Sequence, residues 1–102
     1  YLKLLKFNNK LKVLFSNYKI NNYSRHLFVI LTENKKKIQK KLKQNQISFS
    51  CHYKPISKLK VHRNKKKFDN SNYLFKNMIS LPIYPELKNF HIKKICKVIN
   101  SC

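Results

Sequence analysis

The sequence predicts an α+β fold, a small sheet covered by helices, and three segments carry that prediction. Residues 26–31 form a short run of branched and aromatic side chains, as in a strand buried on both faces. Residues 47–53 alternate between apolar and polar side chains, which is the period of a strand. A closing helix is predicted by apolar residues at i, i+3, i+4 and i+7, namely Ile92, Ile95, Cys96 and Ile99. With 102 residues, the chain has room for one domain, so we expect residues 1–102 to form a single one.

The first third of the chain is predicted to hold a helix end and two strands. Residues 1–6 are typical of the last turns of a helix, and because they show no cap we expect the chain to be truncated. Residues 10–15 alternate loosely and favour a short strand. A loop is expected before the buried strand, marked by Asn21, Asn22 and Ser24.

A surface helix is predicted over residues 34–45. Thr32 is suited to cap it, and the apolar stripe is narrow, since only Ile38 and Leu42 contribute. Asn45 is expected to end the helix, because asparagine tolerates the left-handed conformation better than most residues.

The alternating segment predicts one apolar and one polar strand face. Ser48, Ser50 and His52 fall on the polar face, and the apolar face holds Ile47, Phe49, Cys51 and Tyr53. Pro55 should end the pairing, because proline cannot donate a ladder hydrogen bond. Residues 57–69 follow as a lysine-rich mobile loop.

The last third predicts a helix, an extended segment and the closing helix. Asn70 or Ser71 is expected to cap a helix that runs to about Ile79, with Leu74, Phe75 and Met78 facing inward. Residues 81–85 should be rigid and extended, because Pro82 and Pro85 restrict the backbone. We expect Tyr84 to be structural, wedged between these prolines, and Asn89 to restore part of the cap of the closing helix.

The charge is extreme, but its composition argues against a nucleic-acid partner. Lys and Arg total 24 against three acids, a net charge of +21, and a basic surface attracts phosphates. Only Arg25 and Arg63 are arginine, the residue whose fork best binds phosphate and guanine. Glycine is absent, whereas lysine, asparagine and isoleucine abound. We interpret most of the charge as the product of an AT-rich genome.

The cysteines predict neither disulfides nor a metal centre. Their number is odd and no CxxC spacing occurs, so we expect Cys96 to be a small core residue and Cys102 a frayed terminal thiol. A metal site can be assembled on paper from Cys51, His52, His62, His91 and Cys96, but no spacing requires it.

The sequence contains neither a membrane-length apolar run nor a signal-peptide pattern. Its longest apolar run, residues 27–31, is far short of the roughly 20 residues that span a bilayer. We therefore expect a cytoplasmic protein without a membrane partner.

Three ordered segments resemble one known family. They are HLFVI at residues 26–30, SCHYKPI at residues 50–56 and SLPIYPEL at residues 80–87. Together with the closing helix, they resemble the C-terminal domain of the DegT/DnrJ/EryC1/StrS aminotransferases, which are pyridoxal-phosphate enzymes acting on nucleotide-linked keto sugars. The resemblance covers nearly the whole chain and implies the small domain of the aspartate-aminotransferase fold.

The resemblance also implies what this chain lacks. In the family, the active sites lie at the interface of a homodimer, and the Schiff-base lysine belongs to a large N-terminal domain that is absent here. We therefore expect no bound cofactor and no catalytic residue in this chain alone. Its implied partners are a nucleotide-sugar substrate and the missing large domain or a second subunit.

Substrate contacts are implied for His52 and Tyr53, with Pro55 fixing the turn. His52 also fits a merely solvated sheet face, and Tyr53 also fits the core, so both interpretations stay open for each residue. The family pattern is broken at four positions. Ser57 stands where histidine is common, and Leu59 and Lys60 stand where glutamine and proline are common. Gln46 stands where glycine is expected. Neighbouring Asn45 is expected to take the unusual backbone angle instead.

Two other functions remain open from the sequence. A small nucleic-acid-binding protein would use the lysines of residues 35–43 and 58–67, with Tyr53 or Phe68 stacking on bases. A decayed, inactive remnant would explain the broken motif positions and the absent large domain.

Overall fold

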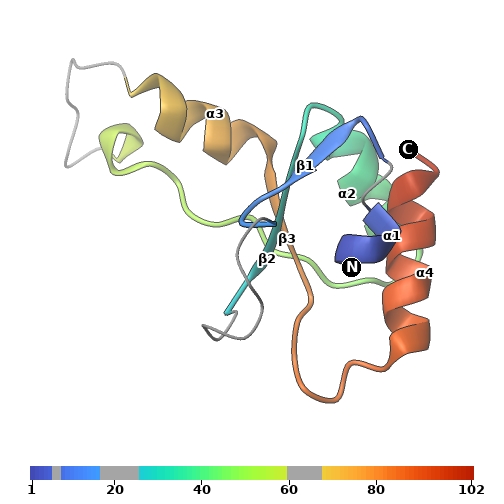
Figure 1. Cartoon of the computed structure of the whole chain (residues 1–102). Coiled ribbons are helices and arrows are strands. Elements are labelled where there is room, and N and C mark those ends of the chain that lie inside the picture. The colour runs from blue at the N-terminus through green and yellow to red at the C-terminus, as the bar shows by residue number, and fades with distance from the viewer. Residues whose placement is uncertain (6–7, 17–25, 60–67) are drawn as a thin grey trace.

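The computed structural model describes residues 1–5, 8–16, 26–59 and 68–102. Within these ranges the chain forms a three-stranded sheet with helices around it, as the sequence predicts (Figure 1). The elements follow in the order α1 (Leu2–Leu5), β1 (Leu11–Val13), β2 (Phe28–Thr32), α2 (Lys35–Gln44), η2 (Ile56–Lys58), α3 (Asp69–Asn77), β3 (Met78–Leu81) and α4 (Asn89–Asn100). None of the helices in the described ranges has the length and hydropathy needed to cross a bilayer. The predicted loop at Asn21, Asn22 and Ser24, and residues 60–67 of the lysine-rich segment, lie outside the described residues.

The sheet is antiparallel, in the order β1-β2-β3. Every residue of the central strand β2 is buried, which confirms the predicted double-sided burial from residue 28 onward, whereas His26 and Leu27 precede the strand and are exposed. Ile30 pairs with Val13 on one side and with Ile79 on the other, so these three side chains share one face. Val29 pairs with Ser80, and these two residues share the opposite face.

The core lies between the Ile30 face of the sheet and helices α1, α2 and α4. Figure 1 shows these three helices together on one side of the sheet, with α3 extending away on the other. Ile38 and Leu42 of α2 are buried, as their spacing predicts. The buried cluster joins all these elements and comprises Leu5, Phe28, Ile30, Ile38, Leu42, Ile79, Leu81, Ile95, Cys96, Ile99 and Cys102.

Two predicted helix caps at the starts of α2 and α4 are wrong. Thr32 is the last residue of β2, and its hydroxyl donates to the carbonyl oxygen of Lys10 and accepts from the amide of Asn34. Asn34 is therefore the N-cap of α2. The predicted cap Asn89 is the first residue of α4, and Lys88 occupies the N-cap position without a side-chain hydrogen bond. Thr32 is not the cap because Glu33 and Asn34 separate it from Lys35, the first helical residue.

The end of α2 closes in a Schellman motif around a left-handed residue. Asn45 is the C-cap, as predicted, but its φ of −95° is not left-handed. Gln46 takes the positive φ, at 56°, so the prediction that Asn45 would spare it is wrong. The amide of Gln46 donates to Lys43, and that of Ile47 donates to Leu42. These bonds fix the position of the left-handed residue, regardless of which neighbour tolerates the angle best.

The predicted strand over residues 47–53 reduces to one bridge. Ser50 pairs with Ser80 of β3, and the rest of the segment takes part in no ladder within the described sheet. Ile47 and Phe49 pack against the core as predicted. Beyond the bridge the alternation breaks down, because Cys51 is exposed and His52 is half-buried.

The strand of the last third, β3, begins earlier than predicted. Helix α3 starts at Asp69 with Phe68 at its N-cap, so neither Asn70 nor Ser71 caps it. It ends at Asn77, and Met78 opens β3, which places Ile79 in the sheet core rather than at a helix end. The extended segment predicted over residues 81–85 shares only Leu81 with this strand. Pairing with β2 determines the boundary, because Ile79 lies opposite Ile30.

The C-terminal end of α4 is packed and bound by lysines. Ile95, Cys96 and Ile99 are buried, which confirms the predicted stripe. Cys102 is buried as well, so the prediction of a frayed thiol is wrong. Lys41 Nζ donates to the carbonyl oxygen of Ser101 at 2.8 Å, and two further lysines, Lys10 and Lys37, reach that of Cys102. Cations at this end complement the helix dipole.

Tyr1 ties α1 to the segment that follows β3. Its ring stacks on Phe28 with 4.7 Å between centroids, and its hydroxyl donates to the carbonyl oxygen of Pro82 at 3.0 Å. Burial raises the pKa of the Tyr1 hydroxyl well above its usual range. Tyr84, by contrast, is half-exposed rather than enclosed between Pro82 and Pro85.

Candidate functional site

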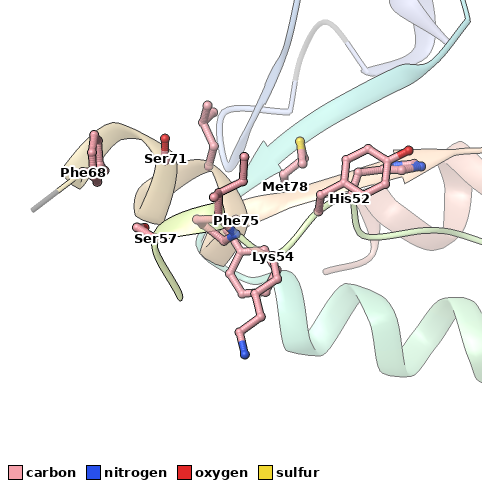
Figure 2. Close-up of a pocket in the computed structure, with 11 residues that line it drawn as sticks. His52, Lys54, Ser57, Phe68, Ser71, Phe75 and Met78 are labelled. Atoms are coloured by element: carbon pink, nitrogen blue, oxygen red, sulfur yellow. The ribbon is translucent and has the colours of Figure 1, made fainter. Parts of the chain in front are cut away.

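A groove of about 670 Å³ separates the segment after Ser50 from helix α3. Figure 2 shows His52 at one end of this groove, Phe68 at the other, and Lys54 and Phe75 between them. The lining residues are His52, Tyr53, Lys54, Pro55, Ile56, Ser57, Phe68, Ser71, Leu74, Phe75 and Met78. The first wall comes from residues 52–57, and the second comes from residues 68–78, most of them in α3.

The first wall is shaped by a proline-initiated turn. Pro55 stands before the short 3₁₀ helix η2 with φ −53° and ψ 137°. Its carbonyl oxygen accepts from the amide of Lys58 at 2.8 Å, and that of Ile56 accepts from Leu59 at 2.9 Å. Proline fixes φ near this value at no further entropic cost, so the segment turns here and leads toward α3.

His52 is held at the groove by the buried hydroxyl of Ser80. His52 Nδ1 lies 3.0 Å from Ser80 Oγ, and Ser80 is only 2% exposed. The backbone of Ser80 is itself fixed, because its amide donates to Ser50 at 2.8 Å and its carbonyl accepts from Ser50 at 3.0 Å. The imidazole is therefore a half-buried group with a defined partner rather than a solvated side chain on a sheet face.

Tyr53 is not a core residue. Its side chain is 81% exposed, although the alternating pattern placed it on the apolar face. Its ring lies edge-on to that of His52, with 5.0 Å between centroids. Because the sheet pairing stops at Ser50, the strand period no longer determines which side chains face the core.

The groove combines an apolar lining with a cationic surround. Lys54 lines it directly. The Nζ atoms of Lys35 and Lys58 lie 5.5 and 5.7 Å from the ring centroid of Phe75, within cation–π range. The three acids of the sequence, Glu33, Asp69 and Glu86, are all in described segments, and the lining contains none of them. The local field therefore favours a ligand with negative charge and some apolar surface.

The described residues do not build a site for pyridoxal phosphate. A Schiff-base lysine needs a desolvated amine in a ring-binding pocket. The described lysines are exposed or half-buried, and the half-buried Lys35 and Lys41 donate to backbone carbonyl oxygens. Nor do three or more His, Cys, Asp or Glu side chains gather into a metal site within the part of the chain that the structure describes.

The structure brings some of the predicted site residues together. His52, Tyr53 and Pro55 all line the groove, whereas Pro82 and Pro85 do not. Ser57, one of the positions where the family pattern is broken, also lines it.

The sequence did not predict the second wall of the groove, formed by α3 and its neighbours, because Leu74, Phe75 and Met78 were expected to face a core. Ser80 was also missed as the partner of His52. Its place at the head of the SLPIYPEL segment was the available signal.

Comparison with known proteins gives consistent matches over the whole chain. The family model of the DegT/DnrJ/EryC1/StrS aminotransferases matches residues 1–100. Helicobacter pylori PseC, an aminotransferase involved in the biosynthesis of pseudoaminic acid, has a similar structure, with 25% identity and a TM-score of 0.87 over 99% of this chain and 29% of that one. A DegT/DnrJ/EryC1/StrS aminotransferase from Brucella abortus matches with 24% identity and a TM-score of 0.83 over 99% and 28% of the two chains.

A third similar structure is the PLP form of a Streptococcus pneumoniae protein assigned as a sugar aminotransferase. It matches with 24% identity and a TM-score of 0.74 over 97% of this chain and 27% of that one. This chain thus spans less than a third of the length of these structures. No curated protein matches it.

Proposed function

Because the chain belongs to the DegT/DnrJ/EryC1/StrS aminotransferase family, we propose that it supplies the small domain of an enzyme that aminates nucleotide-linked keto sugars. In this proposal, residues 1–102 form one small domain, and a large domain outside this sequence holds pyridoxal phosphate. That coenzyme supplies the amino-group transfer chemistry when bound. The chain is not competent alone, and we expect the complete enzyme to act in the cytoplasm as a homodimer.

The observation that carries the proposal is the position of the HYKP segment. It forms one wall of a groove with a cationic surround, and its histidine has a fixed partner. We assign His52 and Tyr53 to the substrate, with their polar atoms directed to oxygen atoms of the nucleotide diphosphate or the sugar. Imidazole N–H and phenol O–H groups are both suited to such acceptors. Lys54 adds a positive charge at the same groove.

The proposal divides the work between two parts of an enzyme. This chain binds and orients one end of the substrate, and the groove's apolar residues exclude water from it. The described lysines are not suited to hold the coenzyme, so that task falls to the large domain. The similar structures are more than three times as long as this chain, which leaves room for such a large domain.

A ligand titration tests the substrate part of the proposal. We would measure the affinity of the protein for UDP by calorimetry at two salt concentrations, with inorganic pyrophosphate as the comparison ligand. His52→Ala and Lys54→Ala should each weaken UDP binding by about tenfold, or ~1.4 kcal/mol. His26→Ala is the matched control, because His26 is exposed and is not among the lining residues. Equal affinity of all variants would show that the +21 charge alone attracts the nucleotide.

Complementation tests the division of work. The protein would be co-expressed with the pyridoxal-phosphate domain of a family member and assayed for coenzyme absorbance and amination of a nucleotide-linked keto sugar. Activity that needs both chains and is lost in His52→Ala supports the proposal. Coenzyme absorbance without any amination, in the presence of folded protein, would point to a decayed remnant instead.

A further inference from the structure

We infer that Ser80 is a positioning residue that keeps the proton of neutral His52 on Nε2, so that the imidazole offers an N–H donor to an oxygen acceptor of the ligand. The inference deepens the proposed function and rests on it for the identity of the ligand. It concerns two side chains whose relationship the structure defines without any ligand: His52 Nδ1 and Ser80 Oγ, 3.0 Å apart.

The direction of this hydrogen bond follows from the burial of Ser80. Ser80 is 2% exposed, so its hydroxyl proton is shielded from water and needs an acceptor inside the protein. Among the described residues, His52 Nδ1 is the one acceptor within reach of Ser80 Oγ. Ser80 therefore donates, and Nδ1 accepts with its lone pair.

The tautomer follows from the direction. In a neutral imidazole one ring nitrogen carries the proton and the other accepts, so an accepting Nδ1 places the proton on Nε2. Within the described part of the chain, Nε2 has no hydrogen-bond partner, whereas the ring itself is half-buried. His52 thus presents an unused donor at the end of the groove. A donor selects for oxygen acceptors, such as phosphate or sugar hydroxyl oxygens.

Ser80 is suited to this role because its own position is fixed on both sides. It pairs with Val29 of β2 on one side, and on the other it exchanges two backbone hydrogen bonds with Ser50. The bridge to Ser50 also fixes the chain two residues before His52. The hydroxyl and the ring it holds are therefore fixed relative to each other by the sheet, before a ligand arrives.

The test is a nitrogen-15 NMR measurement of the His52 ring in the protein labelled at histidine. The His52 signals are identified by their loss in His52→Gln, and spectra are recorded at a pH where they show a neutral ring. We expect the Nε2–H fraction to exceed that of a histidine in an unstructured reference peptide. In Ser80→Ala the fraction should fall to the reference value, and Ser80→Thr, which keeps a hydroxyl, should retain the excess. Ser48→Ala, an exposed serine on the same segment, should leave the spectrum unchanged.

The wild-type spectrum is decisive even where a variant does not fold. A predominantly Nδ1–H ring in the wild type would overturn the inference, and so would an unchanged ring in a folded Ser80→Ala. The tautomer is measured without a ligand, so the two proposals can fail separately. If neither the wild type nor any variant bound UDP, the proposed function would be contradicted, but the Nε2–H tautomer of His52 would still hold. If both hold, Ser80→Ala should weaken UDP binding by about threefold to tenfold, with Ser80→Thr closer to the wild type.

Discussion

The amide of Ile47 donates to the carbonyl oxygen of Leu42 at 2.9 Å, across the left-handed residue Gln46. This bond joins the buried stripe of α2 to the segment that leads to the groove, because Ile47 also packs against the core. The motif needs a positive φ at its centre, which glycine adopts without steric cost. Here a glutamine occupies the position, in a sequence that contains no glycine.

Gln46→Gly should raise the free energy of unfolding. Removing the strain of the left-handed conformation should stabilise the folded state by about 1–2 kcal/mol. The greater entropy of glycine in the unfolded chain should destabilise it by about 0.5–1 kcal/mol. The expected net gain of ~0.5–1 kcal/mol is measurable by urea denaturation. Gln44→Gly, two positions earlier in α2, is the control and should destabilise the protein instead. A loss of stability in Gln46→Gly would mean that Gln46 is not strained.

Lys41→Met should lower the stability by removing a cation from the C-terminal end of α4. Lys41 Nζ lies 2.8 Å from the carbonyl oxygen of Ser101 and 2.9 Å from its hydroxyl. We expect a loss of about 0.3–1 kcal/mol at low salt that shrinks as the salt concentration rises. Lys43→Met is the matched control, since Lys43 is exposed and lies with Lys41 in the last turn of α2. Identical effects of the two substitutions would assign the change to net charge alone.

Ile79→Ala should be strongly destabilising. Ile79 is fully buried between the sheet and the helices, so its truncation leaves a cavity and costs about 2–5 kcal/mol. Ile56→Ala removes the same atoms at a site that is 67% exposed and should change the stability by no more than ~0.5 kcal/mol. The midpoints of chemical denaturation give both values. A small effect at Ile79 would contradict its place in the core.

Tyr1→Phe should destabilise the protein at neutral pH by about 1 kcal/mol, because it removes the hydrogen bond to Pro82. This deficit should narrow at alkaline pH. Burial raises the pKa of Tyr1 in the folded state, whereas in the unfolded chain the phenol ionises near pH 10. The stabilisation from the protonated Tyr1 is therefore complete below about pH 10 and declines as the pH rises toward the folded value.

Urea denaturation of wild type and Tyr1→Phe at pH 7, 9 and 10.5 measures this difference. Both proteins retain Cys96, whose pKa burial also raises and whose charge acts on Tyr1, so the comparison is repeated in a Cys96→Ala background. A deficit that stays constant or widens with pH would contradict the assigned burial of the Tyr1 hydroxyl.

The sequence predicts the core of this fold better than its boundaries. The spacing of Ile38 and Leu42, and that of Ile95 and Ile99, identifies the buried faces of α2 and α4, because helical periodicity is a local property. The start of β3 at Met78 was missed. Its residues lie in the sheet because Ile79 pairs with Ile30, some fifty positions earlier, and a local pattern carries no information on that pairing.

The candidate site was likewise predicted where the signal is local and missed where it depends on distant residues. His52, Tyr53 and Pro55 are found through one contiguous segment, and all three line the groove. Of the two interpretations left open for Tyr53, the exposed side chain excludes the core, since strand alternation applies only where a ladder continues. The contact of Ser80 with His52 joins two segments through a single bridge, and only the tertiary structure shows it.

Strand β1 bears on how copies of this chain behave toward one another. It forms one edge of the described sheet, and such an edge can accept a strand from a second molecule. Only Leu11, Lys12 and Val13 belong to it, and the exposed Lys12 stands in the middle. A short edge with a central positive charge resists intermolecular pairing, because each added copy would bring its own cation into line with the last. We therefore expect Lys12 to hinder strand pairing between folded copies of this chain, before any ligand or partner is present.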